Sequence, residues 1–251
     1  LNWVKTSGKI ADSYEHHYYK GLGSIPKDDI HRIYNNIVNG RDVYHVSIWG
    51  DEYTEASIDL AFSKEVKDRK PWVLSWTEKE KTLVSRQSIS EFIHDDLVEY
   101  EYSTLDRAIP KLIDSFKEST RKVFRGITHH WKINGTSFSN GKDIKVIDLQ
   151  AITSLIATYD HGPESLNNTI IVMAQTFCEA NNIPLLICHE SIGSRYQGGK
   201  NHAAPRYLHV APNRIIPYIY RSEDKIILTK QVNEGKTIEP EEYYPIIPIM
   251  L

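Results

Sequence analysis

The chain has few sulfur-containing residues and no long apolar run. Its 251 residues include two cysteines, Cys178 and Cys188, and two methionines. Two cysteines do not make a disulfide framework or a thiolate metal cluster, so we expect both to be buried apolar residues in a reducing compartment. No stretch approaches the roughly 18 consecutive apolar residues of a membrane-spanning helix. The first residues also lack the basic start and apolar stretch of a secretory signal, so we expect no membrane association.

Basic residues are concentrated in two places on a chain that is acidic overall. The formal net charge is −3, which excludes a uniformly basic protein. Between Ser191 and Arg221 every charged residue is cationic: Arg195, Lys200, Arg206, Arg214 and Arg221. A second group is interrupted only by Glu118: Lys117, Arg121, Lys122 and Arg125. Local positive patches on a near-neutral chain are typical of a groove that binds phosphates, although a solvated polar loop gives the same pattern.

Apolar residues at helical spacing predict three helices in the second half of the chain. The first includes Ile109, Leu112, Ile113 and Phe116, and the second includes Leu149, Ile152, Leu155 and Ile156. The third begins after Ser165, a suitable N-cap, and places on one face Leu166, Ile170, Met173, Ala174 and Phe177. Helices are expected because side chains three and four positions apart share a face.

The order of the later segments predicts a winged helix within an α+β chain. The turn "HGPES" joins the second and third helices, and the strand-like segments "IPLLIC" and "RYLHVAP" follow, separated by a glycine-rich loop. Two helices, a turn and then a β-hairpin form the outline of a winged-helix DNA-binding domain, in which the second helix enters the major groove. Other α+β domains share this order, so the pattern alone leaves the fold open.

Seven segments resemble type IIA DNA topoisomerases, most closely the eukaryotic and large-DNA-virus forms. Two of them, "YYKGLGSIPKDDI" and "IDLAFSKEVKDRKPW", resemble the end of the family's TOPRIM domain and the link that follows it. Five resemble its breakage-reunion region: "RAIPKLIDSFKESTRKVF", "SLNNTIIVMAQTFCEANNIPLL", "GSRYQGGK", "PRYLHV" and "EPEEYYPIIPIML". The segments occur in family order and at compatible spacing from about Tyr18 to Leu251.

The resemblance implies four consecutive regions. Residues 1–72 are expected to be the C-terminal part of a TOPRIM domain, residues 73–95 a linker, residues 96–215 the winged-helix breakage-reunion domain, and residues 216–251 the start of a tower domain. The chain has no initiator methionine and ends in an apolar run. We therefore expect a piece of a longer protein.

The resemblance also implies ATP-dependent passage of one DNA duplex through another. In this family each protomer of a homodimer attacks one strand with a tyrosine, holds the 5′ end as a phosphotyrosine, and reseals it. The Mg²⁺ and ATP that the reaction needs would be held outside this chain, so the chain alone should bind double-stranded DNA but cleave it poorly or not at all. An intracellular location is expected, in the nucleus or, for a viral protein, in the host cell. A catalytically silent winged-helix DNA-binding module is the alternative.

The family's functional residues match particular positions of this sequence. Tyr207 corresponds to the nucleophile and Arg206 to its adjacent arginine, while His161 and Arg121 correspond to residues that help to bind the scissile phosphate. Lys117, Lys122, Lys200 and Arg195 are expected to contact DNA, and Ile246 to wedge between base pairs. A phenol ionises near pH 10, so forming the phenolate at pH 7 costs about 4 kcal/mol, which nearby cations would reduce. Lys20 of "YYKGLG" could approach DNA or shape its turn.

Four residues depart from the family's pattern. Asp160 replaces the first histidine of "YHHG", Glu118 replaces the proline of "KPxQRK", and Asn201 and His202 replace an aspartate and an alanine. Asp160 and Glu118 place acidic groups beside the expected DNA-binding cations. We expect these changes to modify DNA affinity without removing the chemistry of Tyr207.

Overall fold

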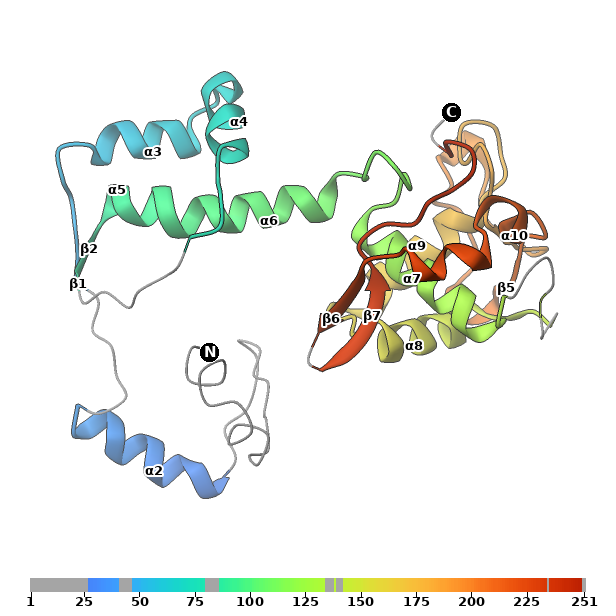
Figure 1. Cartoon of the computed structure of the whole chain (residues 1–251), viewed down its shortest axis with the longest axis horizontal. Coiled ribbons are helices and arrows are strands. Elements are labelled where there is room, and N and C mark those ends of the chain that lie inside the picture. Colours follow the sequence, from blue (N-terminus) through green and yellow to red (C-terminus); the bar gives the residue numbers. More distant parts are fainter. Residues whose placement is uncertain are drawn as a thin grey trace. The chain divides into compact units, whose positions relative to one another are not determined.

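The computed structural model describes residues 27–40, 47–79, 86–133, 138, 142–233 and 235–249. The "YYKGLG" segment with Lys20 lies outside them. The chain divides into two compact units, Leu1–Leu97 and Val98–Leu251 (Figure 1). In the described part of the chain, no helix is both long enough and apolar enough to cross a membrane.

The first unit contains a short parallel strand pair and several helices. Strand β1 (Ser47–Trp49) pairs with β2 (Arg86–Ser88). The helices are α2 (Lys27–Val38), α3 (Thr54–Phe62), α4 (Val66–Leu74), α5 (Ile89–Phe92) and the π-helix η2 (Ile93–Leu97). Helix α3 packs against α5 and η2. Residues 86–95, which the sequence predicts to be part of a linker, instead form β2, α5 and most of η2. Ser88 begins α5 with a capping box closed by Glu91, which satisfies backbone groups at the start of the helix.

Three helices and a small sheet form the core of the second unit. Helices α7 (Glu118–His130), α8 (Val146–Ile156) and α9 (Pro163–Ala174) contact one another. Helix α6 (Val98–Ala108) precedes them. The antiparallel sheet has the order β3 (Ile144–Lys145), β5 (His209–Pro212), β4 (Leu186–Ile187). Side chains from all three helices and from β4 and β5 are fully buried together, among them Phe124, Leu149, Leu166, Leu186 and Val210. This arrangement confirms the predicted α+β class and the helix-turn-helix followed by strands.

Two of the predicted helices differ from those in the structure. Residues 109–117 form a turn-rich segment, and Leu112 is 88% exposed. The cause is Pro110, which disfavours helical backbone at the preceding residue and has no N–H to donate. The third helix begins with Pro163 after the N-cap Gly162, earlier than the predicted Ser165 cap. Proline suits the first helical position because its missing N–H would have no partner there.

The segment after β5 packs onto the same core. It forms α10 (Ile216–Ile219), the 3₁₀-helix η5 (Ser222–Ile226), β6 (Lys230–Asn233) and β7 (Lys236–Pro240). The β6–β7 hairpin lies beside α7 (Figure 1). The rings of Phe124 and Tyr220 are 4.4 Å apart, and those of Phe124 and Tyr243 are 4.8 Å apart. Residues 216–243 therefore help to close the core of the second unit.

Candidate functional site

Tyr207 combines a fixed backbone with an exposed side chain. It ends the 3₁₀-helix η4 (Pro205–Tyr207), immediately before β5. Its neighbour Leu208 is fully buried, and the carbonyl of Leu208 accepts a 2.9 Å hydrogen bond from the N–H of Val146, at the start of α8. The Tyr207 side chain is 61% exposed. The fold thus holds the phenol-bearing residue in place while leaving its ring open to a large substrate.

Arg206 lies against the ring of Tyr207. Its guanidinium carbon is 5.0 Å from the centre of that ring, within the range of a cation–π contact. A guanidinium remains protonated at all relevant pH values, so it carries a permanent positive charge to the phenol. This is the one pair of expected catalytic residues for which the described part of the chain gives a direct contact.

The loop between β4 and η4 is held by a buried glutamine. Gln175 is 5% exposed, and its Nε2 donates to the carbonyls of Ile192 at 3.0 Å and Gly199 at 3.1 Å. The loop includes the 3₁₀-helix η3 (Arg195–Gln197). At its other end the Oδ1 atom of Asn201 accepts from Ser194 N at 2.9 Å. A single amide oxygen is sufficient for that bond, which explains why asparagine serves where the family has aspartate.

We expect Gly199→Ala to destabilise the second unit by about 2–4 kcal/mol, because left-handed strain adds to overpacking. Gly199 has φ +77°, and an added Cβ would overlap the Gln175 side chain. The matched control is Gly198→Ala, because Gly198 has φ +55° with nothing within 4 Å of an added Cβ; it should cost only about 1 kcal/mol. Urea unfolding of both variants gives the comparison. Equal losses would show that Gln175 does not hold the loop rigidly.

Arg121 is buried in an ion pair. Its side chain is 5% exposed and that of Asp114 is fully buried. Nε donates to Asp114 Oδ2 at 2.7 Å, and Nη2 donates to Asp114 Oδ1 and the Phe116 carbonyl, both at 3.0 Å. Burial by itself lowers the pKa of Arg121, but the hydrogen bonds and charge of Asp114 outweigh burial and raise it. The expected scissile-phosphate contact therefore has only Nη1 left to make it.

Lys122 is also buried, which corrects the expectation that it contacts DNA directly. Its side chain is 7% exposed, and Nζ lies 2.7 Å from Glu239 Oε1 and 3.7 Å from Glu118 Oε1. Nζ also donates to the carbonyl of Ala157 at 2.9 Å. These partners tie α7 to β7 and to the end of α8. Glu118, the departure from the family's proline, therefore has a structural partner.

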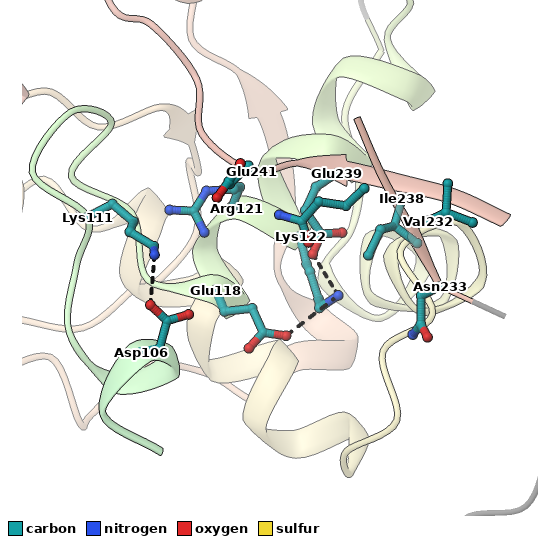
Figure 2. A pocket seen from close by; sticks show the side chains of 11 residues that line it. Asp106, Lys111, Glu118, Arg121, Lys122, Val232, Asn233, Ile238, Glu239 and Glu241 are labelled. Carbon is teal, nitrogen blue, oxygen red and sulfur yellow. Dashed lines mark hydrogen bonds and ion pairs between the residues drawn. The ribbon is translucent and has the colours of Figure 1, made fainter. Parts of the chain in front are cut away.

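Arg121 and Lys122 line a mixed-charge cavity of about 630 Å³ beside α7 and the β6–β7 hairpin (Figure 2). Its other charged residues are Asp106, Lys111, Glu118, Glu239 and Glu241. Figure 2 shows the Lys122 ammonium between Glu118 and Glu239. Since the cations of this cavity face several acidic groups, it is not the positive groove that the sequence predicts for this cluster.

The remaining expected residues are exposed on several elements. Lys117 is the N-cap residue of α7, and Lys200 follows the glycine pair of the loop. Arg195 is paired with Glu179 at 2.9 Å, and both side chains are more than half exposed. His161 is exposed in the turn before α9, with its ring 5.4 Å from that of Tyr159. Ile246 is 63% exposed, although its N–H donates to the Ile219 carbonyl at 3.0 Å.

The cysteines are not the buried apolar residues that the sequence predicts. Cys178 is exposed, and Cys188 is partly buried. Burial, and then its hydrogen bond to Glu190 at 3.2 Å, raise the pKa of the Cys188 thiol to about 11. A thiol with such a pKa stays protonated near neutral pH and is a poor nucleophile.

A serine–histidine pair in the first unit is not a nucleophile with its base. Ser57 Oγ and His94 Nε2 are 3.2 Å apart. Trp72 Nε1 donates to His94 Nδ1 at 3.0 Å, so Nδ1 is the acceptor and the neutral ring carries its proton on Nε2. His94 in this state donates to Ser57 and cannot remove its proton.

Sequence reasoning missed Asp114, Glu239 and Glu190, which hold the expected site residues or their neighbours in place. Asp114 and Glu239 could have been sought as partners for the basic cluster, but nothing in a local pattern shows which acids are buried. Among the described residues, no group of three or more histidine, cysteine, aspartate or glutamate side chains could hold a metal ion. We therefore assign no catalytic step of this part of the chain to a metal.

Family models match both parts of the chain. The model of the DNA gyrase/topoisomerase IV family, built on its A-type chain, matches residues 107–251, and that of the C-terminal associated domain of TOPRIM matches residues 1–105. The chain is 35% identical over 255 residues to DNA topoisomerase 2 of Invertebrate iridescent virus 6, covering 98% of this chain and 21% of the relative. It is 35% identical over 243 residues to DNA topoisomerase 2 of Saccharomyces cerevisiae, covering 95% of this chain and 16% of the relative.

A solved structure is similar over nearly the whole chain. It is the DNA-binding, cleavage and re-ligation domain of Plasmodium falciparum topoisomerase II, with 30% identity and a TM-score of 0.78, covering 99% of this chain and 34% of that chain. The chain thus spans only a minor part of the proteins it matches. The agreement of family models, relatives and solved structure shows that the chain belongs to the type II DNA topoisomerase family.

Proposed function

We propose that this chain is the DNA-binding and cleavage core of a type II DNA topoisomerase, with Tyr207 as the nucleophile. The observation that carries the proposal is the arrangement at η4: an exposed phenol on a fixed backbone, with a guanidinium 5.0 Å from its ring centre. The position of this pair in a "PRY" segment, in a chain of this family, distinguishes it from an ordinary surface tyrosine.

In the proposed reaction the Tyr207 oxygen attacks a phosphorus atom of the DNA backbone. A bond forms between them while the bond from phosphorus to the 3′ oxygen breaks. The phenolic proton is lost, and the 3′ oxygen leaves with a proton as a hydroxyl. Arg206 stabilises negative charge on the phenolate and the phosphoryl oxygens. The reverse attack by the 3′-hydroxyl expels the phenolate and reseals the strand, so the number of phosphoester bonds is conserved.

We propose that exposed cations guide DNA to Tyr207 while buried ones shape the frame. Lys117, Lys200 and Arg195 are exposed and suited to bind backbone phosphates. Exchange of Glu179 for a phosphate would free Arg195 at little cost, since exposed ion pairs are weak. His161 remains a proposed scissile-phosphate contact. Arg121 would act chiefly by positioning, with Nη1 as its remaining donor, and Lys122 only by positioning.

Ile246 is the proposed wedge between base pairs. Its backbone is anchored to Ile219 while its side chain projects into solvent. Apolar side chains in such positions can unstack a base step and bend the duplex. Bending would bring more of the positive surface into contact with the DNA backbone.

The whole enzyme would require parts that lie outside this chain. We propose that Mg²⁺ and ATP bind there, that the enzyme acts on double-stranded DNA as a homodimer, and that it works in the nucleus or, if viral, in the host cell. These proposals rest on family membership.

The test joins this chain to an upstream TOPRIM segment of a family member and adds Mg²⁺ and supercoiled plasmid. Stopping the reaction with detergent should yield linear DNA with protein attached to its 5′ ends. A catalytically silent winged-helix module would instead shift the plasmid in a gel without breaking it. Cleavage products that carry no protein would contradict the phosphotyrosine mechanism.

A further inference from the structure

A carboxylate grips His209 from two directions, just beyond Tyr207. The N–H of His209 donates to Glu190 Oε2 at 3.1 Å, and its ring Nδ1 lies 2.9 Å from Glu190 Oε1. Cys188 Sγ donates to Oε2 as well, at 3.2 Å. Burial opposes ionisation of this carboxyl group, but the hydrogen bonds from Cys188 and His209 lower the pKa of Glu190 to about 2. Glu190 is therefore an anion at any pH at which the protein is studied.

This contact fixes both the ring position and its protonation pattern. A carboxylate only accepts hydrogen bonds, so Nδ1 of His209 must carry a proton. The other ring nitrogen, Nε2, has no hydrogen-bond partner among the residues that the structure describes. The His209 side chain is 36% exposed, so a ligand can approach from solvent.

The strand geometry places His209 beside Tyr207 on one face. Leu208 between them has extended backbone and is fully buried, as is Val210. Side chains alternate between the two faces of a strand, so Tyr207 and His209 leave on the side opposite Leu208. Two residues of strand span about 6.6 Å. The imidazole therefore lies one strand repeat away from the proposed nucleophile.

The surroundings of His209 favour an anionic ligand. Lys145 stands directly opposite it in the β3–β5 ladder and is exposed. Arg206 and Tyr207 face this side from η4, and Glu190 and Cys188 from the segment after β4. Glu190 is the one acidic group in this set, and two of its bonds are donated by His209 itself.

We propose that His209 is an additional contact to the DNA backbone beside the cleavage tyrosine, and that Glu190 is its positioning residue. The inference rests on the proposed function and extends it to a residue outside the expected site. A phosphate oxygen only accepts, so it needs a proton on Nε2 while Nδ1 keeps its proton for Glu190. The contact thus requires the doubly protonated ring. Its contribution to DNA affinity is present at low pH and is lost as pH rises.

The test measures DNA affinity without cleavage. The 251-residue chain carrying Tyr207→Phe is titrated with a duplex at several salt concentrations, at about pH 6 and about pH 8.5. Each backbone phosphate contact contributes about −0.9 to the slope of log affinity against log salt. Adding His209→Gln should make the slope at pH 6 shallower by about 0.9 and leave the slope at pH 8.5 unchanged. His31→Gln, the same change on exposed α2, should alter neither slope.

Glu190→Gln tests the positioning role. Its amide oxygen still accepts one hydrogen bond but no longer aligns both donors of His209. In that background His209→Gln should change the pH 6 slope by clearly less than about 0.9, since residues that act together are not additive. Unfolding midpoints of all variants establish that they are folded.

The outcomes separate the two proposals. Slopes unaffected by His209→Gln, or affected equally at both pH values, would overturn the His209 assignment alone. Failure of the chain to bind duplex DNA under any of these conditions would overturn the proposed function as well. A full slope change in the Glu190→Gln background would remove Glu190 from the account.

Discussion

Tyr207→Phe should abolish the covalent protein–DNA adduct while leaving DNA affinity within about twofold of the parent. The substitution removes one oxygen atom, so no phosphoester bond to this residue can form. The rest of the frame is unaffected, because Leu208 is fully buried and its carbonyl is held by Val146. Such loss of chemistry without loss of binding is the signature of a group used in the reaction itself. The assay is detergent trapping with the upstream segment and Mg²⁺ present.

Tyr196→Phe is the control for this experiment. Tyr196 lies on η3 in the same loop and is 96% exposed, more than Tyr207 at 61%. If accessibility were sufficient for attack on DNA, Tyr196 would be the better nucleophile. We expect its removal to leave the adduct yield unchanged. Adducts that persist in Tyr207→Phe and disappear in Tyr196→Phe would reverse the assignment.

Asp114→Asn should lower the free energy of unfolding of the second unit by about 3–5 kcal/mol. The change leaves the buried Arg121 guanidinium without a counter-charge, and a buried charge without a partner is costly. Asp114 also accepts hydrogen bonds from Phe116 N at 2.9 Å and Tyr243 N at 3.1 Å. One carboxylate thus joins α7 to the segment after β7. Urea denaturation of the chain measures the loss.

Asp106→Asn is a control with the same ion-pair distance. Asp106 and Lys111 are 2.7 Å apart, as are Asp114 and Arg121, but the Asp106 and Lys111 side chains are 52% and 31% exposed. Solvated pairs contribute about 0–1 kcal/mol, so this variant should be nearly as stable as the parent. Similar losses in both variants would show that burial does not set the strength of these pairs.

The prediction for Asp114 bears on how Arg121 variants are interpreted. Arg121→Ala would remove the proposed phosphate contact and the buried ion pair together. A loss of cleavage in that variant therefore has to be compared with its loss of stability. Cleavage that falls while the unfolding free energy stays unchanged would favour the direct phosphate contact expected from the sequence.

The order of elements in the second unit was predictable because its cause is local. Apolar positions at helical spacing define α8 and α9, and glycine and proline mark the turn between them. The errors were local as well. Ile109, Leu112 and Ile113 have helical spacing, but Pro110 ends the helix at Ala108. Phe177 continues the apolar pattern of α9, yet the helix ends at Ala174.

The partners of the site residues were less predictable, because they are set by tertiary packing. Tyr207 and Arg206 are adjacent in the sequence, so their proximity needs no fold. Whether Lys122 meets DNA or the interior depends on Glu239, which lies on a distant strand. His209 and Glu190 are 19 residues apart and meet only because β4 and β5 pair. A sequence shows which charges are present but not which of them are buried against each other.

The identity of the residue joined to DNA tests the central claim most directly. The trapped adduct is digested with nuclease and trypsin, and the peptide that carries a nucleotide is found by mass spectrometry. Trypsin separates the two exposed tyrosines of this region, because it cleaves after Arg195, Lys200, Arg206 and Arg214. The account predicts a 5′-linked nucleotide on the peptide that begins with Tyr207. A nucleotide on the peptide containing Tyr196, or on any other residue, would contradict it.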